Sequence, residues 1–190
     1  MTKELKEFLL QNRELIETEN YYKLYCAVNN HFKHKSASFT KELSEFLIEC
    51  DVNPLEHLLT VPTAYLANSD LIDHIVIPDN IEVIERAAFL GSELKSVTFN
   101  DTSKCTAIIS YAFDFCGYLE TVILPPSCTL IGNNAFGFCE HLKSIVIPST
   151  ATNMFIDDLA FSATPNVKIY CKPGYVEDYC INNNIEYELL

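Results

Sequence analysis

Cysteine is the residue type that most plainly offers chemistry in this chain. Eight cysteines occur among its 190 residues, and four of them form two evenly spaced pairs. Cys105 and Cys128 are 23 residues apart, and so are Cys116 and Cys139. Regular spacing suggests either a disulfide framework or a metal site. No two cysteines stand in a C-x-x-C pattern, so we do not expect structural zinc.

The other candidates for chemistry are isolated. His31 and His34 are spaced to share a helix face, but no further metal ligand lies near them in the sequence. The five glycines do not cluster, and the G-x-S-x-G pattern of a serine nucleophile is missing. The acidic residues show no calcium-loop spacing. We therefore expect a protein that is not an enzyme and that uses no metal ion or cofactor.

A repeat of 23 to 25 residues explains the cysteine spacing. The pattern I-x3-A-F occurs four times, and its phenylalanines are Phe89, Phe113, Phe136 and Phe161. A leucine-like position and a short β-branched run follow each one, such as VIL from Val122 or IVI from Ile145. The segment from Tyr65 keeps the IVIP ending without the Ala-Phe pair. We interpret this segment as a degenerate first repeat.

A unit with one short strand and no room for a long helix cannot bury its own apolar side. Stacking of successive units solves this problem, because each repeat covers the one before it. Burial of each repeat phenylalanine is worth about 1.5 to 3 kcal/mol. Cys116 and Cys139 lie at a small core position that Ser92 and Thr164 occupy in other repeats. We therefore expect reduced thiols that act as small hydrophobes, although stacking could also bring two thiols within bonding distance.

The consensus I-x3-AF-x2-C-x2-L-x2-V-x-IP, clearest from Ile131 to Pro148, resembles the BspA-like class of bacterial leucine-rich repeats. The resemblance covers about residues 64 to 174. It implies a solenoid that works as a non-enzymatic binding scaffold for other proteins, often at cell surfaces. The sequence from Asn166 also resembles the way such arrays close, with a final strand, a short helix near 176–182 and a last extended piece.

We therefore predict an α+β solenoid of short parallel-sheet leucine-rich repeats. A helical N-terminal domain over residues 1–62 precedes the solenoid of residues 63–190, which ends in a cap from about residue 168. Apolar periodicity predicts helices within 5–16, 21–32 and 43–47, and Asn53-Pro54 predicts a further helix start. The helical segment either covers the first repeat or recognises a partner. In the second case Tyr21, Tyr22 and Tyr25 are candidate hot spots.

Two surfaces of the solenoid are candidates for partner binding. Strand alternation predicts an unusually apolar outward column on the sheet, formed by Val76, Thr98, Ile123, Val146 and Tyr170. Phe115 and Phe138, each two residues after a repeat phenylalanine, predict an aromatic turn edge that Tyr118 extends. In the alternative interpretation, the column serves strand propensity alone and the two phenylalanines fold back into the core.

Acidic residues dominate the charge of the chain. The formal net charge is −13, of which residues 61–190 carry −10. Such a surface promotes solubility, repels nucleic acid and anionic membranes, and favours a basic protein partner. Our first hypothesis is a protein–protein interaction module. The alternative is an acidic phage-type inhibitor that blocks a basic nucleic-acid-binding effector by charge mimicry.

The sequence also predicts where the protein works. The first residues, MTKELKEFLL, lack the features of an export signal, and no apolar run approaches the roughly 20 residues of a membrane span. We therefore expect a cytoplasmic protein that binds neither membrane nor nucleic acid directly.

Overall fold

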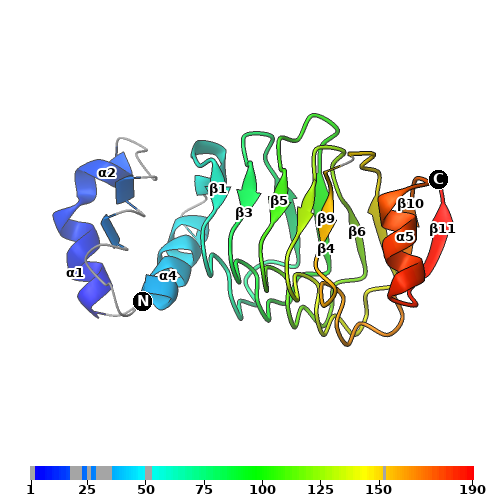
Figure 1. Cartoon of the computed structure of the whole chain (residues 1–190). Coiled ribbons are helices and arrows are strands. Elements are labelled where there is room, and N and C mark those ends of the chain that lie inside the picture. The colour runs from blue at the N-terminus through cyan, green and yellow to red at the C-terminus, as the bar shows by residue number, and fades with distance from the viewer. Residues whose placement is uncertain (1–2, 18–22, 25–26, 29–35, 50–52, 152) are drawn as a thin grey trace.

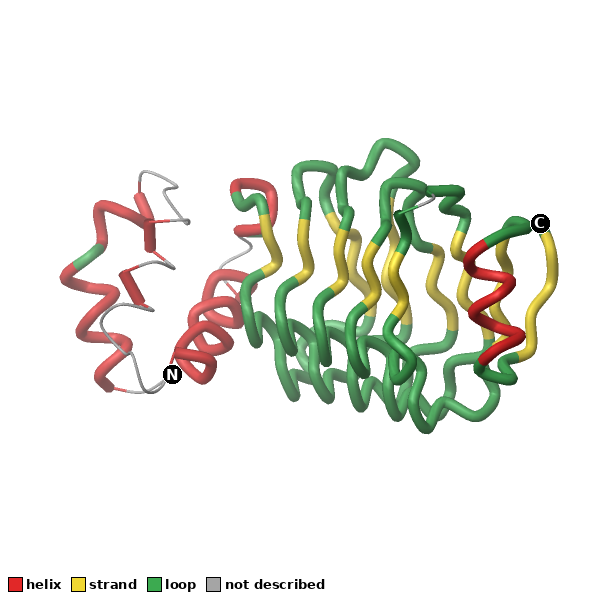
Figure 2. Tube along the Cα trace, viewed as in Figure 1, coloured by secondary structure: helices red, strands yellow, loops and turns green. Residues whose placement is uncertain are grey.

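A computed structural model describes residues 3–17, 23–24, 27–28, 36–49, 53–151 and 153–190. Its N-terminal part is helical and its larger C-terminal part is a solenoid (Figure 1). Among the described residues, the helices with defined bounds in this part are α1 (Lys3–Gln11), α2 (Arg13–Glu17) and α4 (Ser36–Glu49), and a 3-10 turn, η1 (Pro54–His57), follows them. Helix α4 lies between α1 and the solenoid in Figures 1 and 2.

Apolar side chains three and four residues apart account for the helices. Leu5, Phe8 and Leu9 make the buried face of α1, and Leu43 and Leu47 are buried on α4. Both predicted segments, 5–16 and 43–47, are helical, although 5–16 is divided between α1 and α2. Much of the predicted 21–32 helix lies outside the described residues, as do the candidate residues Tyr21, Tyr22, Tyr25, His31 and His34.

The helix start predicted at Asn53 is present, but the helix is a single 3-10 turn. The Asn53 side chain accepts a hydrogen bond from the Leu55 backbone N–H at 3.1 Å, and Pro54 occupies the first turn. The turn ends at His57 because the chain enters the sheet at Thr60.

The solenoid has two parallel sheets (Figure 2). The six-stranded sheet contains, in spatial order, β2 (His74–Ile77), β4 (Ser96–Phe99), β6 (Thr121–Ile123), β8 (Ser144–Ile147), β10 (Lys168–Cys171) and β11 (Glu186–Leu189). The five-stranded sheet contains β1 (Thr60–Val61), β3 (Val83–Ile84), β5 (Ala107–Ile108), β7 (Leu130–Ile131) and β9 (Phe155–Ile156). The prediction of one strand per repeat was therefore wrong. Strands of two residues are too short to show the alternation by which a strand is recognised.

The repeat phenylalanines form one column through the core, as predicted. Phe113 stacks on Phe89 with ring centroids 5.1 Å apart and on Phe136 at 5.3 Å, and Phe161 continues the stack 5.7 Å beyond Phe136. The interplanar angles in these three pairs are 9° or less. Tyr65 packs edge-on against Phe89 at 5.9 Å. Each repeat therefore covers the apolar ring of its neighbour, which a single repeat cannot do alone.

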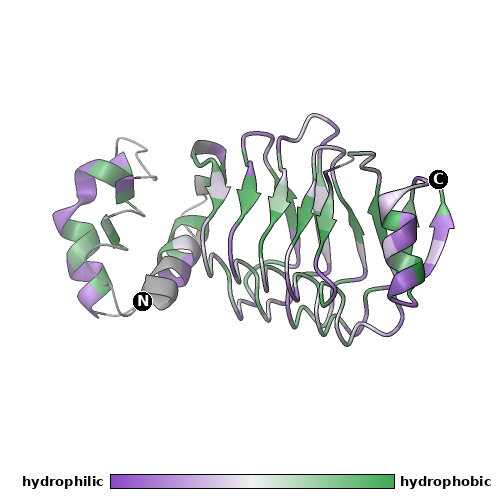
Figure 3. Cartoon of the chain, viewed as in Figure 1, coloured by the Kyte–Doolittle hydropathy of each residue, from purple (hydrophilic) through white to green (hydrophobic). Residues whose placement is uncertain are grey.

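The two ends of the solenoid differ in the elements that form them. At the start, β1 pairs with β3, so the sheet begins at Thr60, inside the segment predicted as helical. At the other end, α5 (Tyr175–Asn182) buries Val176, Tyr179 and Cys180, and β11 pairs with β10. Strand β11 is largely hydrophilic in Figure 3, which suits an exposed sheet edge. Within the described residues, no helix combines the length and apolar content needed to cross a membrane.

Candidate functional site

The described cysteines are part of the hydrophobic core. The six described cysteines have free thiols and are buried. The Cys116 thiol donates to the Phe89 carbonyl at 3.1 Å, and the Cys139 thiol donates to the Phe113 carbonyl at 3.2 Å. Burial raises the pKa of Cys116 to about 11, so its thiol stays protonated at neutral pH. Among the residues with described positions, no three His, Cys, Asp or Glu side chains gather as metal ligands.

The predicted apolar column is a continuous row on the six-stranded sheet. Val76 lies beside Thr98, and Val146 lies between Ile123 and Tyr170. Val76 and Ile123 are 57% and 55% exposed, whereas Val146 and Tyr170 are half-buried. The exposed members of the row, Val76 and Ile123, therefore present branched side chains to solvent.

A second row, just before the strands of this sheet, alternates acid and base. Backbone hydrogen bonds order it as Asp73, Lys95, Glu120 and Lys143. Lys95 pairs with Asp73 at 3.1 Å, and Lys143 pairs with Glu120 at 3.2 Å. The hydrogen bond from Lys95 lowers the pKa of Asp73. These exposed pairs add little stability, but they prevent this row from presenting charge of one sign.

Exposed aromatic rings form two stacks at the turn after the repeat phenylalanine. Phe115 and Phe138 are 4.5 Å apart between centroids and nearly parallel at 4°. They are 56% and 39% exposed, so they lie on the surface and do not widen the core. Tyr118 stacks on His141 at 6.3 Å. We call these residues the aromatic edge: Phe115, Phe138, Tyr118 and His141.

The backbone beneath Phe115 and Phe138 is in the left-handed region. Their φ angles are 58° and 52°, which cost a bulky residue roughly 1–2 kcal/mol each. Gly91, at the equivalent position of the preceding repeat, has φ 65° without that cost. Hydrogen bonds between repeats hold the turns, because the Phe115 N–H donates to the Gly137 carbonyl at 2.9 Å and the Phe138 N–H to the Ser162 carbonyl at 2.8 Å.

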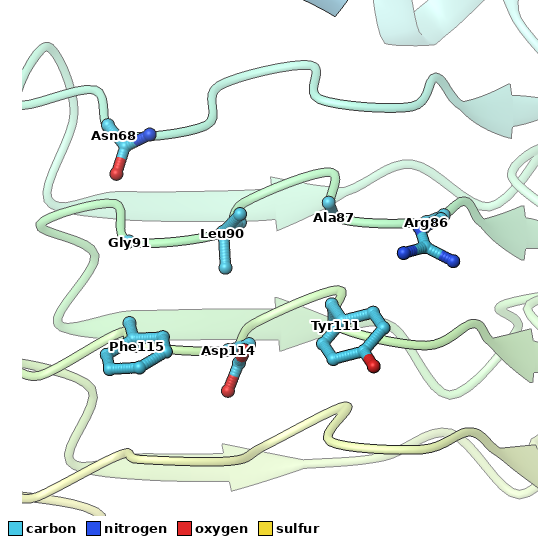
Figure 4. A pocket seen from close by; sticks show the side chains of 8 residues that line it. All are labelled: Asn68, Arg86, Ala87, Leu90, Gly91, Tyr111, Asp114 and Phe115. Carbon is cyan, nitrogen blue, oxygen red and sulfur yellow. The ribbon is translucent and has the colours of Figure 1, made fainter.

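A groove of about 460 Å³ runs beside Phe115 (Figure 4). Its walls come from three successive repeats and consist of Asn68, Arg86, Ala87, Leu90, Gly91, Tyr111, Asp114 and Phe115. The Arg86 guanidinium lies over the Tyr111 ring, 4.9 Å from its centroid. Phe115 was predicted as a binding residue from the sequence, whereas the groove was not. The sequence signal that could have pointed to the groove was Arg86, because it is the one arginine between residue 14 and the end of the chain.

Asp114 is a buried polar residue of the groove whose carboxylate lacks a complete set of partners. It is 4% exposed, and its Oδ1 atom is buried without a hydrogen bond. This burial raises the pKa of the Asp114 carboxyl. Gly137 of the next repeat adjoins the carboxylate, where an added Cβ would stand 2.6 Å from Oδ1. The glycine therefore makes room for the acid.

Comparison with known families agrees with this geometry. Residues 60–187 match six copies of the BspA type leucine-rich repeat region. The chain belongs to this family. These leucine-rich repeats extend further than the four clear copies and one degenerate copy predicted from the sequence, since the match reaches from β1 into β11. The membership fits a non-enzymatic repeat protein suited to protein interaction.

Comparison with individual proteins adds little to the family match. No curated protein matches the chain. Among solved structures, this leucine-rich repeat chain is similar to the pneumococcal vaccine antigen PcpA, with 13% identity and a TM-score of 0.41. The similarity covers 68% of this chain and 43% of that one, so the chain spans less than half the length of that structure.

Proposed function

We propose that this leucine-rich repeat protein is a protein–protein interaction module without catalytic activity, and that its aromatic edge anchors the partner. The observation that carries the proposal is the exposed stack of Phe115 and Phe138 on left-handed backbone. The fold accepts Gly91 at the same place, so the rings are not required to make the turn. Strained positions that persist on a surface are typical of functional sites, and exposed aromatic rings are typical of binding hot spots.

The apolar column of the six-stranded sheet extends the proposed interface. Tyr118 of the aromatic edge lies three residues before β6, and Ile123 is the last residue of that strand. A partner that packs on the edge can therefore continue onto the column of Val76, Thr98, Ile123, Val146 and Tyr170.

Charge mimicry by an acidic phage-type inhibitor is the less favoured alternative, and the net charge of −13 is its main support. A mimic of nucleic acid needs a line of charges of one sign. The row from Asp73 to Lys143 alternates in sign instead. We therefore favour apolar docking over charge mimicry.

We also propose that the helical segment that precedes β1 covers the first repeat and that residues 168–190 cap the last one. Two contacts support the first part: the Lys41 ammonium donates to the Asn68 carbonyl at 3.0 Å, and the Ser69 hydroxyl donates to Glu45 at 2.7 Å. The Lys168 pairs with Glu186 and Glu188 support the second part, because they place charges on the edge strand β11.

Affinity capture with a matched pair of variants tests the proposed anchor. The immobilised chain captures proteins from a lysate of the native host, and quantitative mass spectrometry compares wild type with the double variant Phe115→Gly, Phe138→Gly. We expect the specific partner to be lost while the fold remains. Phe155→Ser is the control, because Phe155 is 53% exposed on the other sheet.

The same capture separates the two functional hypotheses. Apolar docking should survive raised salt, whereas charge mimicry should weaken steeply as counterions screen it. Undiminished capture by the double variant would refute the aromatic anchor.

A further inference from the structure

The groove beside Phe115 has the size and lining of a ligand site. Its volume of about 460 Å³ falls in the range of roughly 300–1,000 Å³ seen for small-ligand pockets. Figure 4 shows Asp114 between Tyr111 and Phe115 on one repeat, with Arg86 on the preceding repeat. A carboxylate therefore stands between two aromatic rings.

The carboxylate of Asp114 is poorly satisfied within the protein. It is 4% exposed, and its Oδ1 accepts no hydrogen bond. By contrast, the carboxylate of Glu85 on the preceding repeat is satisfied, because it accepts hydrogen bonds from the hydroxyl groups of Thr60 and Thr63. No ion pair reaches Asp114 from the described residues, and the neighbouring thiols of Cys116 and Cys139 are neutral. A buried acid of this kind in a folded protein calls for an explanation.

The surroundings of Asp114 favour a cation. Residues 61–190 carry a net charge of −10, so the solenoid attracts positive groups over a distance. Aromatic faces attract guanidinium and ammonium groups, and Arg86 over Tyr111 shows that this ring accepts a guanidinium. Leu90 and Phe115 give apolar walls along which the methylene stem of a long basic side chain can lie.

We propose that this groove binds an arginine or lysine side chain of the protein partner, paired with Asp114 and flanked by Tyr111 and Phe115. The proposal rests on the proposed function and names the chemistry of the partner. In the bound state the cation lies beside the acid and offsets the cost of burying it. Asp114 recognises the charge, and the aromatic edge supplies the adjoining apolar contact.

Arg86 suggests a second interpretation of the groove, in which the ligand is an anion. It forms no ion pair with any described residue, so in this second interpretation its ligand is a carboxylate of the partner. Such a ligand would approach Asp114 and a strongly acidic protein, and both repel it. The two readings give opposite results when Arg86 is replaced, because Arg86 repels a cationic ligand and attracts an anionic one.

Nuclear magnetic resonance with small probes tests the proposal on the full chain. The probe is N-acetyl-arginine amide, with the neutral isostere N-acetyl-citrulline amide as its control. We expect the arginine probe to shift the Asp114 carboxyl carbon and the ring protons of Tyr111 and Phe115 saturably, with affinity in the millimolar range. Citrulline should bind at least about tenfold more weakly, which is the effect of losing about 1.4 kcal/mol.

Three variants complete the test. Asp114→Asn, which keeps the shape of the side chain, should weaken the arginine probe about tenfold. Arg86→Gln should leave that probe as tight or tighter, and Phe155→Ser should leave it unchanged. Absence of arginine shifts, equal binding by Asp114→Asn, or binding of N-acetyl-glutamate amide that Arg86→Gln abolishes would overturn the proposal.

These outcomes are independent of the capture experiment. If the arginine probe binds but the double variant Phe115→Gly, Phe138→Gly still captures the partner, the aromatic anchor is refuted and the cation site is supported. Partner capture that needs the aromatic edge, without arginine binding, refutes the cation site alone.

Discussion

Phe136 and Phe138 are two residues apart and both stack on an equivalent ring, yet we expect their loss to have very different effects on stability. Phe136 is fully buried and stacks on two neighbours, at 5.3 and 5.7 Å. Truncation of a buried phenylalanine costs about 3–5 kcal/mol. Because two stacked contacts and the continuity of the column are lost together, Phe136→Ala should fall in the upper half of that range.

Phe138→Gly should cost about 1–2 kcal/mol, well below the loss expected for Phe136→Ala. The variant loses one exposed stack, worth about 0.5–1.5 kcal/mol, and glycine adds an entropic cost of about 0.5–1 kcal/mol. Release of the left-handed strain at φ 52° opposes both losses by roughly 1–2 kcal/mol. Phe138 is 39% exposed, so loss of the buried part of its ring adds about 1–2 kcal/mol, and the net cost is about 1–2 kcal/mol.

Urea denaturation followed by circular dichroism measures both variants. Phe136→Ala should lower the midpoint strongly, while Phe138→Gly should lower it only modestly with an unchanged slope. A loss in Phe138→Gly as large as that in Phe136→Ala would show that the surface ring is part of the core structure. The case for the aromatic edge as a binding anchor would then fail.

Three further predictions concern single sites. The pKa of Asp114 is raised in the folded state, so the ionised carboxylate destabilises the fold. Asp114→Asn should therefore raise the melting temperature at neutral pH, and this increase should shrink as the pH falls through the pKa of Asp114. An increase that stays constant across pH contradicts this reasoning. Gly132→Ala places a Cβ 2.7 Å from the Ser110 backbone nitrogen and should cost about 1–3 kcal/mol by urea titration, whereas Gly117→Ala meets nothing within 4 Å and should be nearly neutral. The Cys116 thiol, with its pKa raised to about 11, should react with a maleimide only on unfolding; rapid labelling of its peptide in the native protein, by mass spectrometry, contradicts its burial.

Much of the solenoid was predictable from the sequence because the residues that define the repeat are buried in the core. The phenylalanine column, the core position of Cys116 and the order of strand, helix and strand at the C-terminus all agree with the sequence-based predictions. The five-stranded sheet was missed, because each of its strands contributes two residues and only one of them, such as Ile84, is buried. The outward column was found for the opposite reason, since β4 and β8 are long enough to show alternation.

The sequence by itself determined that the chain stacks in units of about two dozen residues and which rings fill its interior, because burial requires apolar residues at fixed intervals. Only the tertiary structure decided that Phe115 and Phe138 stand on left-handed backbone, since backbone hydrogen bonds to residues over 20 positions away hold those turns. It likewise brought Arg86 of one repeat beside Tyr111 of the next, and set Asp114 against Gly137. A groove whose walls come from different repeats leaves no pattern within any one of them.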